Sequence, residues 1–170
     1  MRHLIILIFT FLFALPTFSQ DESASETTTY YFIRHAEKNR SDANDRNPHL
    51  LQKGNLRAAK WSFVLEHVKF DAVYSTDYNR TKETAQPTAE RNGLDITIYD
   101  PRQLNSEAFI ANTKGKTVLV VGHSNTTPMF VNAVLGVKKH ANIDDSNNAN
   151  LYIVTIAASG EKSDTVLVVD

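Results

Sequence analysis

Arg34 and His35 are the first residues of this chain whose types and placement could do chemistry. A guanidinium offers a planar fork of donors to an anion, and the neighbouring imidazole offers a base or a nucleophile. The residues before them, 30–33 (Tyr-Tyr-Phe-Ile), are typical of a short buried strand. Ligands of open α/β sheets bind beyond the carboxyl ends of strands, so the pair lies where a site is expected. A single Arg-His pair is more often part of a solvated charged loop, and the downstream residues are what favour a site.

Two further predicted strands also end in residues suited to an anion. Ser75 ends the strand predicted at 71–75 and leads to Arg80, in the first turn of a predicted helix. His123 and Ser124 follow the apolar run 117–121 and open another helix. A helix N-terminus attracts anions through its dipole and its free backbone N–H groups, which favours Arg80 and the N–H of Ser124 as phosphate ligands.

Two Arg and two His at one sheet edge predict a site for a dianionic phosphoryl group. Phosphoryl transfer needs neutralised oxygens and an in-line nucleophile. His35, neutral and oriented by a backbone carbonyl, could be that nucleophile and form a phosphohistidine. His123 would add a hydrogen bond or a positive charge.

Alternating strands and helices must position these side chains. The pattern predicts an α/β fold, a three-layer α/β/α sandwich with a mostly parallel central sheet. In the helix predicted over 50–68, Leu56, Ala59, Phe63 and His67 share one stripe that should face the sheet, with Trp61 beside it. Further strands are predicted at 71–75, 94–99 and 117–121, with terminal strands at 151–157 and 165–169. Further helices are predicted at 78–92, at 102–112 and from the segment 122–126 to about 135, and a polar loop at 138–150.

Four motifs in this order resemble the histidine phosphatase superfamily, also called phosphoglycerate mutase-like. They read R-H-A-E-K, L-x-x-G-x-x-R-A, Y-S-x-x-x-x-R-x-x-x-T-A and V-V-G-H-S-N-T, and together they span most of residues 30–135. The resemblance implies that His35 accepts the phosphoryl group, that Arg34 and Arg80 clamp it, and that His123 completes the pocket. It gives Arg57 a place on a helix surface by default.

The general acid is the weakest part of the resemblance. Larger relatives carry a Glu in an insertion after the second helix, whereas residues 92–114 here are short. Glu107 is the tentative acid, with Asp100 at a strand end as the other candidate, and Glu107 could equally be a solvated helix residue. Glu37 and Lys38 are expected to form local ion pairs or loop structure.

The same short region bears on substrate and cofactor. The chain resembles the compact, lid-less members, which act on small phosphomonoesters or on phosphohistidine in proteins, and open access of water favours hydrolysis over transfer. No cofactor or metal is implied, because Arg and His supply the positive charge and His49, His67 and His140 have no ligand spacing. Oligomeric state is not indicated.

The N-terminal residues predict export. A basic start, an apolar run over 4–15 and small residues before Gln20 suggest a signal peptide at 1–19, followed by a flexible lead-in at 20–29 and one domain at 30–170. Twelve residues are too few for a membrane-spanning helix, which needs about 20, so no stable membrane association is expected after cleavage; a retained anchor is the alternative. The chain has no Cys, and its 18 basic and 19 acidic residues argue against nucleic acid as a partner.

Two other functions were weighed against a phosphatase. The sequence G-H-S-N-T at 122–126 has the setting of an α/β-hydrolase nucleophile elbow, but the second Gly is missing and no acid lies between Ser124 and the next histidine, His140. A phosphate- or phospholigand-binding module without turnover is the second alternative. The sequence favours an exported, periplasmic or secreted, metal-independent phosphatase that acts on a small phosphorylated substrate or a phosphoprotein.

Overall fold

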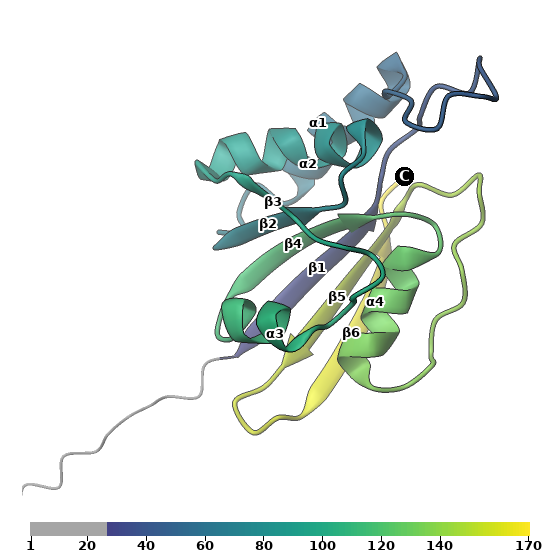
Figure 1. The fold of residues 1–170 in the computed structure, drawn as a ribbon. Helices are drawn as coiled ribbons and strands as arrows, with labels where there is room; N and C mark the ends of the chain where they lie inside the picture. The colour runs from purple at the N-terminus through teal and green to yellow at the C-terminus, as the bar shows by residue number, and fades with distance from the viewer. Residues whose placement is uncertain (1–26) are drawn as a thin grey trace, which may run out of the picture.

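The computed structural model describes residues 27–170, which form one six-stranded sheet with helices on both faces (Figure 1). The strand order is β3-β2-β4-β1-β5-β6. Strands β3, β2, β4 and β1 run parallel, and β5 and β6 are antiparallel additions at one edge. The bounds are β1 (Thr28–Arg34), β2 (Ala72–Ser75), β3 (Ile96–Ile98), β4 (Thr117–Gly122), β5 (Asn150–Ile156) and β6 (Lys162–Val168).

Two helices cover each face of the sheet, which confirms the predicted three-layer sandwich. Helices α1 (Gln52–Val64) and α2 (Asn79–Asn92) lie on one face, and α3 (Glu107–Thr113) and α4 (Thr126–Leu135) lie on the other (Figure 1). No helix within residues 27–170 is long and apolar enough to cross a membrane. The predicted signal peptide at 1–19 lies outside the described residues.

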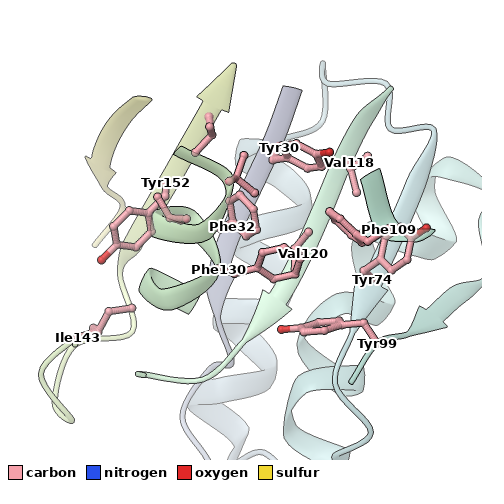
Figure 2. Close-up of a cluster of buried hydrophobic side chains, with 13 residues drawn as sticks. Tyr30, Phe32, Tyr74, Tyr99, Phe109, Val118, Val120, Phe130, Ile143 and Tyr152 are labelled. Carbon is pink, nitrogen blue, oxygen red and sulfur yellow. The ribbon is translucent and has the colours of Figure 1, made fainter. Parts of the chain in front are cut away.

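The sheet has a separate core on each face because its central strands are buried on both sides. Figure 2 shows the core under α3 and α4, where Phe32, Phe109 and Phe130 meet with ring centroids 4.8 to 5.2 Å apart. Under α1 and α2, Ile33 of β1 packs with Trp61. These apolar central strands fix the register that brings the polar strand ends together at one edge.

The predicted buried stripe of α1 is wrong. Leu56 and Phe63 are 67% and 63% exposed, and the helix covers only Gln52–Val64 of the predicted 50–68. Its buried residues include Gly54, Ala58 and Trp61. The reason is close packing, because a Cβ on Gly54 would lie 2.3 Å from the carbonyl oxygen of Glu37. This close approach turns Gly54 and Ala58 toward the protein together with Trp61, and leaves Leu56 and Phe63 facing solvent.

Several element boundaries also differ from the prediction. Strand β1 begins at Thr28, so the last two residues of the proposed lead-in belong to the sheet, where β-branched Thr is favoured. The helix predicted over 102–112 is confined to α3, because the Ser106 side chain caps it by accepting a hydrogen bond from Phe109 N at 3.2 Å. The N-cap of α2 is Tyr78, and none of residues 75–77 caps that helix.

Candidate active site

The ends of three neighbouring parallel strands, β2, β4 and β1, bring the predicted site residues together. The His35 and His123 rings lie 5.5 Å apart between centroids and are inclined at 67°. The backbone N–H of His35 donates to the carbonyl of Gly122 at 2.9 Å, which joins the two strand ends directly. They line a central cavity of about 390 Å³, whose walls include Arg34, His35, Lys38, Arg80, His123 and Ser124.

His35 is held as a neutral imidazole with one nitrogen free. Its Nδ1 lies 2.7 Å from the carbonyl oxygen of Ala36, so Nδ1–H donates and the lone pair is on Nε2. Burial, with smaller contributions from His123 and the nearby guanidinium groups, lowers the pKa of His35 to about 3. The Asn148 side-chain amide donates to the His35 carbonyl at 2.8 Å and fixes the backbone there. At neutral pH, Nε2 is therefore available as a nucleophile.

The tautomer of His123 follows from a chain of hydroxyl groups. Oγ1 of Thr81 lies 2.9 Å from the carbonyl oxygen of Thr76 and 3.0 Å from that of Tyr78, and carbonyls only accept. The Thr76 hydroxyl, 3.0 Å from Thr81 Oγ1, therefore donates its one proton there. It accepts at 3.0 Å from Nε2–H of His123, and the neutral ring carries its lone pair on Nδ1. Burial, then the positive charge of Arg80, lowers the pKa of His123 to about 4.

Arg80 enters the cavity from the first turn of α2. Its guanidinium carbon lies 4.3 Å from the centre of the Tyr78 ring, a cation–π contact that covers one face of that ring. Its Nε is buried and has no hydrogen-bond partner among the described residues. A buried donor without a partner is costly, and an oxyanion in the cavity would satisfy it.

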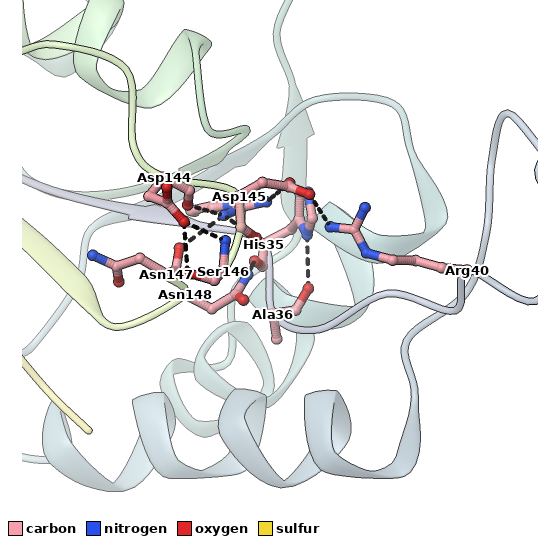
Figure 3. Close-up of polar contacts among 9 residues, drawn as sticks. His35, Ala36, Arg40, Asp144, Asp145, Ser146, Asn147 and Asn148 are labelled. Atoms are coloured by element: carbon pink, nitrogen blue, oxygen red, sulfur yellow. Dashed lines mark hydrogen bonds and ion pairs between the residues drawn. The ribbon is translucent and has the colours of Figure 1, made fainter.

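Arg34 is held by a loop, residues 144–147, that the sequence analysis does not place at the site. Its Nη1 donates to the carbonyls of Asp144 and Asn147, both at 2.8 Å, and to that of Asp145 at 3.1 Å. Its Nη2 donates to the Asp145 carboxylate at 2.7 Å. Figure 3 shows residues 144–148 gathered beside His35, with Arg40 reaching Asp145 from the other side. Arg34 Nε stays buried and unpartnered, so the donors left for an anion are fewer than a free guanidinium would offer.

The other predicted residues fall into two groups. Ser124 lines the central cavity, just before α4. Glu107 is exposed in the first turn of α3 and does not line the central cavity, so the structure does not bring it to His35. Asp100 accepts hydrogen bonds from Arg102, which lower its pKa and oppose the protonated form that an acid needs.

Glu37 and Lys38, the charged residues that follow the site in sequence, make different contacts. Glu37 pairs with Nε of Arg57 at 2.9 Å, which confirms local pairing for Glu37. Arg57 also donates to the carbonyl of Val169 and is mostly covered, so the default helix-surface role given to it is wrong. Lys38 lines the central cavity and forms no ion pair with any described residue. Burial and the charge of Arg80 lower its pKa.

The sequence could not predict that residues 144–148 lie beside His35 and contact Arg34, because Asn and Asp in a loop indicate turns and do not identify a contact partner. Within residues 27–170, no group of three or more His, Cys, Asp or Glu side chains could hold a metal ion.

Comparisons with known proteins agree with this geometry. Residues 30–102 match the model of the histidine phosphatase superfamily (branch 1). No curated protein sequence matches the chain.

Solved structures share the fold at low sequence identity. The protein histidine phosphatase SixA in complex with tungstate is 14% identical and has a TM-score of 0.63, covering 82% of this chain and 96% of its own. A mycobacterial glucosyl-3-phosphoglycerate phosphatase is 12% identical with a TM-score of 0.63, covering 85% and 100%. A phosphoglycerate mutase from Bacillus anthracis str. Sterne is 16% identical with a TM-score of 0.63, covering 84% and 93%. The sequence match and the shared phosphoglycerate mutase-like fold together confirm the resemblance of this chain to the histidine phosphatase superfamily.

Proposed function

We propose that this protein is a phosphatase that hydrolyses phosphomonoesters, or phosphohistidine in a protein, through a phosphohistidine intermediate on His35. The observation that carries the proposal is the orientation of His35. Its Nδ1–H is fixed on the Ala36 carbonyl, and burial keeps the ring neutral, so Nε2 presents a lone pair. The family match supports a phosphatase in the broad sense.

The proposed reaction has two displacements at phosphorus. In the first, His35 Nε2 forms a bond to phosphorus while the bond from phosphorus to the leaving oxygen breaks, and the leaving group gains a proton from water or from an acid. In the second, water attacks the phosphohistidine, phosphate leaves, and Nε2 regains its lone pair. In both steps the transition state carries negative charge on the three equatorial oxygens of the phosphoryl group.

The groups around His35 can stabilise that negative charge by hydrogen bonds and positive charge. The buried Nε atoms of Arg34 and Arg80 have no hydrogen-bond partner within residues 27–170, and the two arginine residues line the central cavity. Lys38 adds an unpaired ammonium group, and Ser124 precedes the N-terminus of α4. Structures of the related proteins in complex with tungstate, VO3 and inorganic phosphate show that this fold holds phosphate-like anions elsewhere. We propose that these side chains replace a metal ion in the reaction.

Export and the source of the leaving-group proton also remain proposals. We infer from the sequence that residues 1–19 direct the protein to the periplasm or the medium. Glu107 was the tentative acid, but it lies outside the central cavity. The one carboxylate in that cavity is Asp145, whose pKa is lowered by hydrogen bonds from Arg40 and Arg34. Esters with poor leaving groups should therefore react slowly.

The test is hydrolysis of p-nitrophenyl phosphate in EDTA by the wild type and by His35→Ala, with His67→Ala as the control. His67 is an exposed histidine in the segment after α1 and lines no part of the central cavity, so its loss should leave the rate unchanged. Turnover in EDTA that disappears only in His35→Ala is the expected result. An acid-labile, alkali-stable phosphoryl label on the wild type would identify the intermediate. Binding of vanadate without hydrolysis of any ester would instead favour a binding module, the function that the lack of an acid in the cavity allows.

A further inference from the structure

At the edge of the sheet that carries the site, the strand order places His35 away from the cavity wall formed by residues that follow β2 and β3. His35 follows β1, His123 follows β4, Tyr78 and Arg80 follow β2, and Pro101 follows β3. Neighbouring strands are about 4.8 Å apart. The residues after β2 and β3 are therefore two and three strands away from His35, beyond the His123 ring.

An in-line displacement places the leaving group on the side of phosphorus opposite to the attacking nitrogen. A phosphoryl group held between His35, Arg80 and His123 would then direct its leaving oxygen away from β1. The cavity wall on that side includes Tyr78 and Pro101. A second cavity of about 470 Å³ shares His35, Lys38 and Asp145 with the central one, and so lies on the nucleophile's side.

An outer recess opens from the far wall. It has a volume of about 660 Å³, shares Tyr78 and Pro101 with the central cavity, and also includes Ile98. Tyr78 is 36% exposed and Ile98 is 47% exposed, so an apolar surface faces solvent directly beside the phosphate position. The charged residues of the recess compensate one another in part, because Asp100 and Arg102 form an ion pair at 2.8 Å.

We propose that this outer recess of Tyr78, Ile98 and Pro101 binds the leaving group of the substrate and favours apolar, ring-sized leaving groups over small or strongly anionic ones. The inference rests on the proposed function, because it uses the in-line attack of His35. It assigns to Ile98 and Tyr78 a role in specificity, whereas Arg34, Arg80 and His123 bind the phosphoryl group common to all substrates.

The test compares leaving groups of similar basicity, so that chemical reactivity does not imitate recognition. Benzyl phosphate and ethyl phosphate both release a primary alcohol and differ in the ring. The corresponding benzylphosphonate and ethylphosphonate cannot be hydrolysed and report binding alone. One methylene group in a hydrophobic pocket is worth about 10- to 200-fold, and a ring in an open, half-exposed recess should lie at the low end of that range. We expect about a tenfold preference for the benzyl compound in both kcat/KM and phosphonate affinity.

The variants identify the surface responsible. Ile98→Ala should lower the benzyl preference about threefold and leave ethyl phosphate unaffected, because it removes part of the apolar surface that would contact the ring. Ile110→Ala is the matched control, since Ile110 is 45% exposed on α3 and lines no part of the recess. Lys53→Ala tests the cavity on the nucleophile's side.

Three results would overturn the inference: equal affinity for the two phosphonates, a benzyl preference untouched by Ile98→Ala, or a preference removed by Lys53→Ala. Failure of the proposed function looks different. In that case p-nitrophenyl phosphate would not be hydrolysed either, and the phosphonate affinities would still decide whether the recess binds an apolar ring.

Discussion

Nε2 of His123 lies 3.0 Å from Oγ1 of Thr76, and this contact determines which nitrogen of the second histidine can meet the substrate. Because the hydroxyl proton of Thr76 goes to Thr81, the Thr76 oxygen accepts from Nε2–H. The lone pair of neutral His123 is then on Nδ1, to which no described residue donates a hydrogen bond. A lone pair facing an oxyanion repels it, so His123 must gain a proton to act as a donor.

We therefore expect anion binding to take up a proton at His123. The pKa of His123 is lowered to about 4 in the free protein, mainly by burial, and a bound dianion raises it. At pH 6 the free ring is neutral and the bound ring is charged, so affinity should fall as the pH rises from the free-state pKa of about 4 to the raised bound-state pKa. Sulfate is a suitable probe because it stays dianionic over this range.

Calorimetry of sulfate binding at pH 6 in two buffers of different ionisation enthalpy measures that proton. The wild type should take up close to one proton, and His123→Gln should take up none while binding more weakly. His49→Gln controls for histidine titration elsewhere, because His49 is exposed and pairs with Glu83. Buffer-independent binding by the wild type would show that His123 accepts or donates without changing its charge.

Loss of the Thr76 hydroxyl should impair activity more than it impairs folding. Thr76→Val keeps the shape of the side chain but leaves Nε2–H of His123 without its acceptor in a buried position, which costs about 1–3 kcal/mol. We expect kcat/KM to fall about tenfold. Thr88→Val is the matched control: its hydroxyl is buried and has no partner, so the change should be neutral or stabilising. Equal effects of the two substitutions on kcat/KM would count against a positioning role for Thr76.

The strand ends of this fold could be predicted from sequence because burial on both faces leaves a plain signal. Uninterrupted apolar residues mark β4 and most of β1, and the polar residues after them stand out. Parallel strands then meet at one edge by topology, which placed Arg34, His35, Arg80 and His123 together without any knowledge of side-chain contacts.

Two features had no such signal. The inward face of α1 depends on how closely the helix approaches Glu37, and periodicity alone selected Leu56 and Phe63, which are exposed. The contacts of residues 144–147 with Arg34 join parts of the sequence that are far apart, and they are mostly to backbone carbonyls, which every residue carries. Glu107 was chosen because it lies in the region where larger relatives carry the acid, and in the structure it is exposed in the first turn of α3.

Gly54→Ala should reduce both stability and activity, although Gly to Ala within a helix normally stabilises by about 1 kcal/mol. The new Cβ would lie 2.3 Å from the Glu37 carbonyl oxygen, two residues after His35. Either α1 or the segment after His35 must move, and we expect the melting temperature and kcat/KM to fall together. Gly160→Ala controls for stability, because its strained φ of +86° lies in the distant β5–β6 turn with nothing within 4 Å. An active, fully stable Gly54→Ala protein would contradict the close packing of α1.

Asp145→Asn should strengthen anion binding, because the Asp145 carboxylate competes with substrate for Arg34. The two side chains lie 2.7 Å apart, and Asp145 also pairs with Arg40 at 2.8 Å. The carbonyls of residues 144, 145 and 147 continue to hold Arg34 Nη1 when the charge is removed, so its position should persist. A unit charge near the anion in water is worth about 1 kcal/mol at 4 Å.

We therefore expect sulfate to bind about threefold tighter to Asp145→Asn at low ionic strength, with a smaller gain at 0.15 M salt, where the screening length is about 8 Å. Asp42→Asn changes the net charge by the same amount, and Asp42 does not line the central cavity. The affinity of this variant for sulfate should therefore match that of the wild type. Weaker binding by Asp145→Asn would reverse the interpretation: the carboxylate would then be needed to orient Arg34, and its negative charge near the phosphate would be a cost of that orientation.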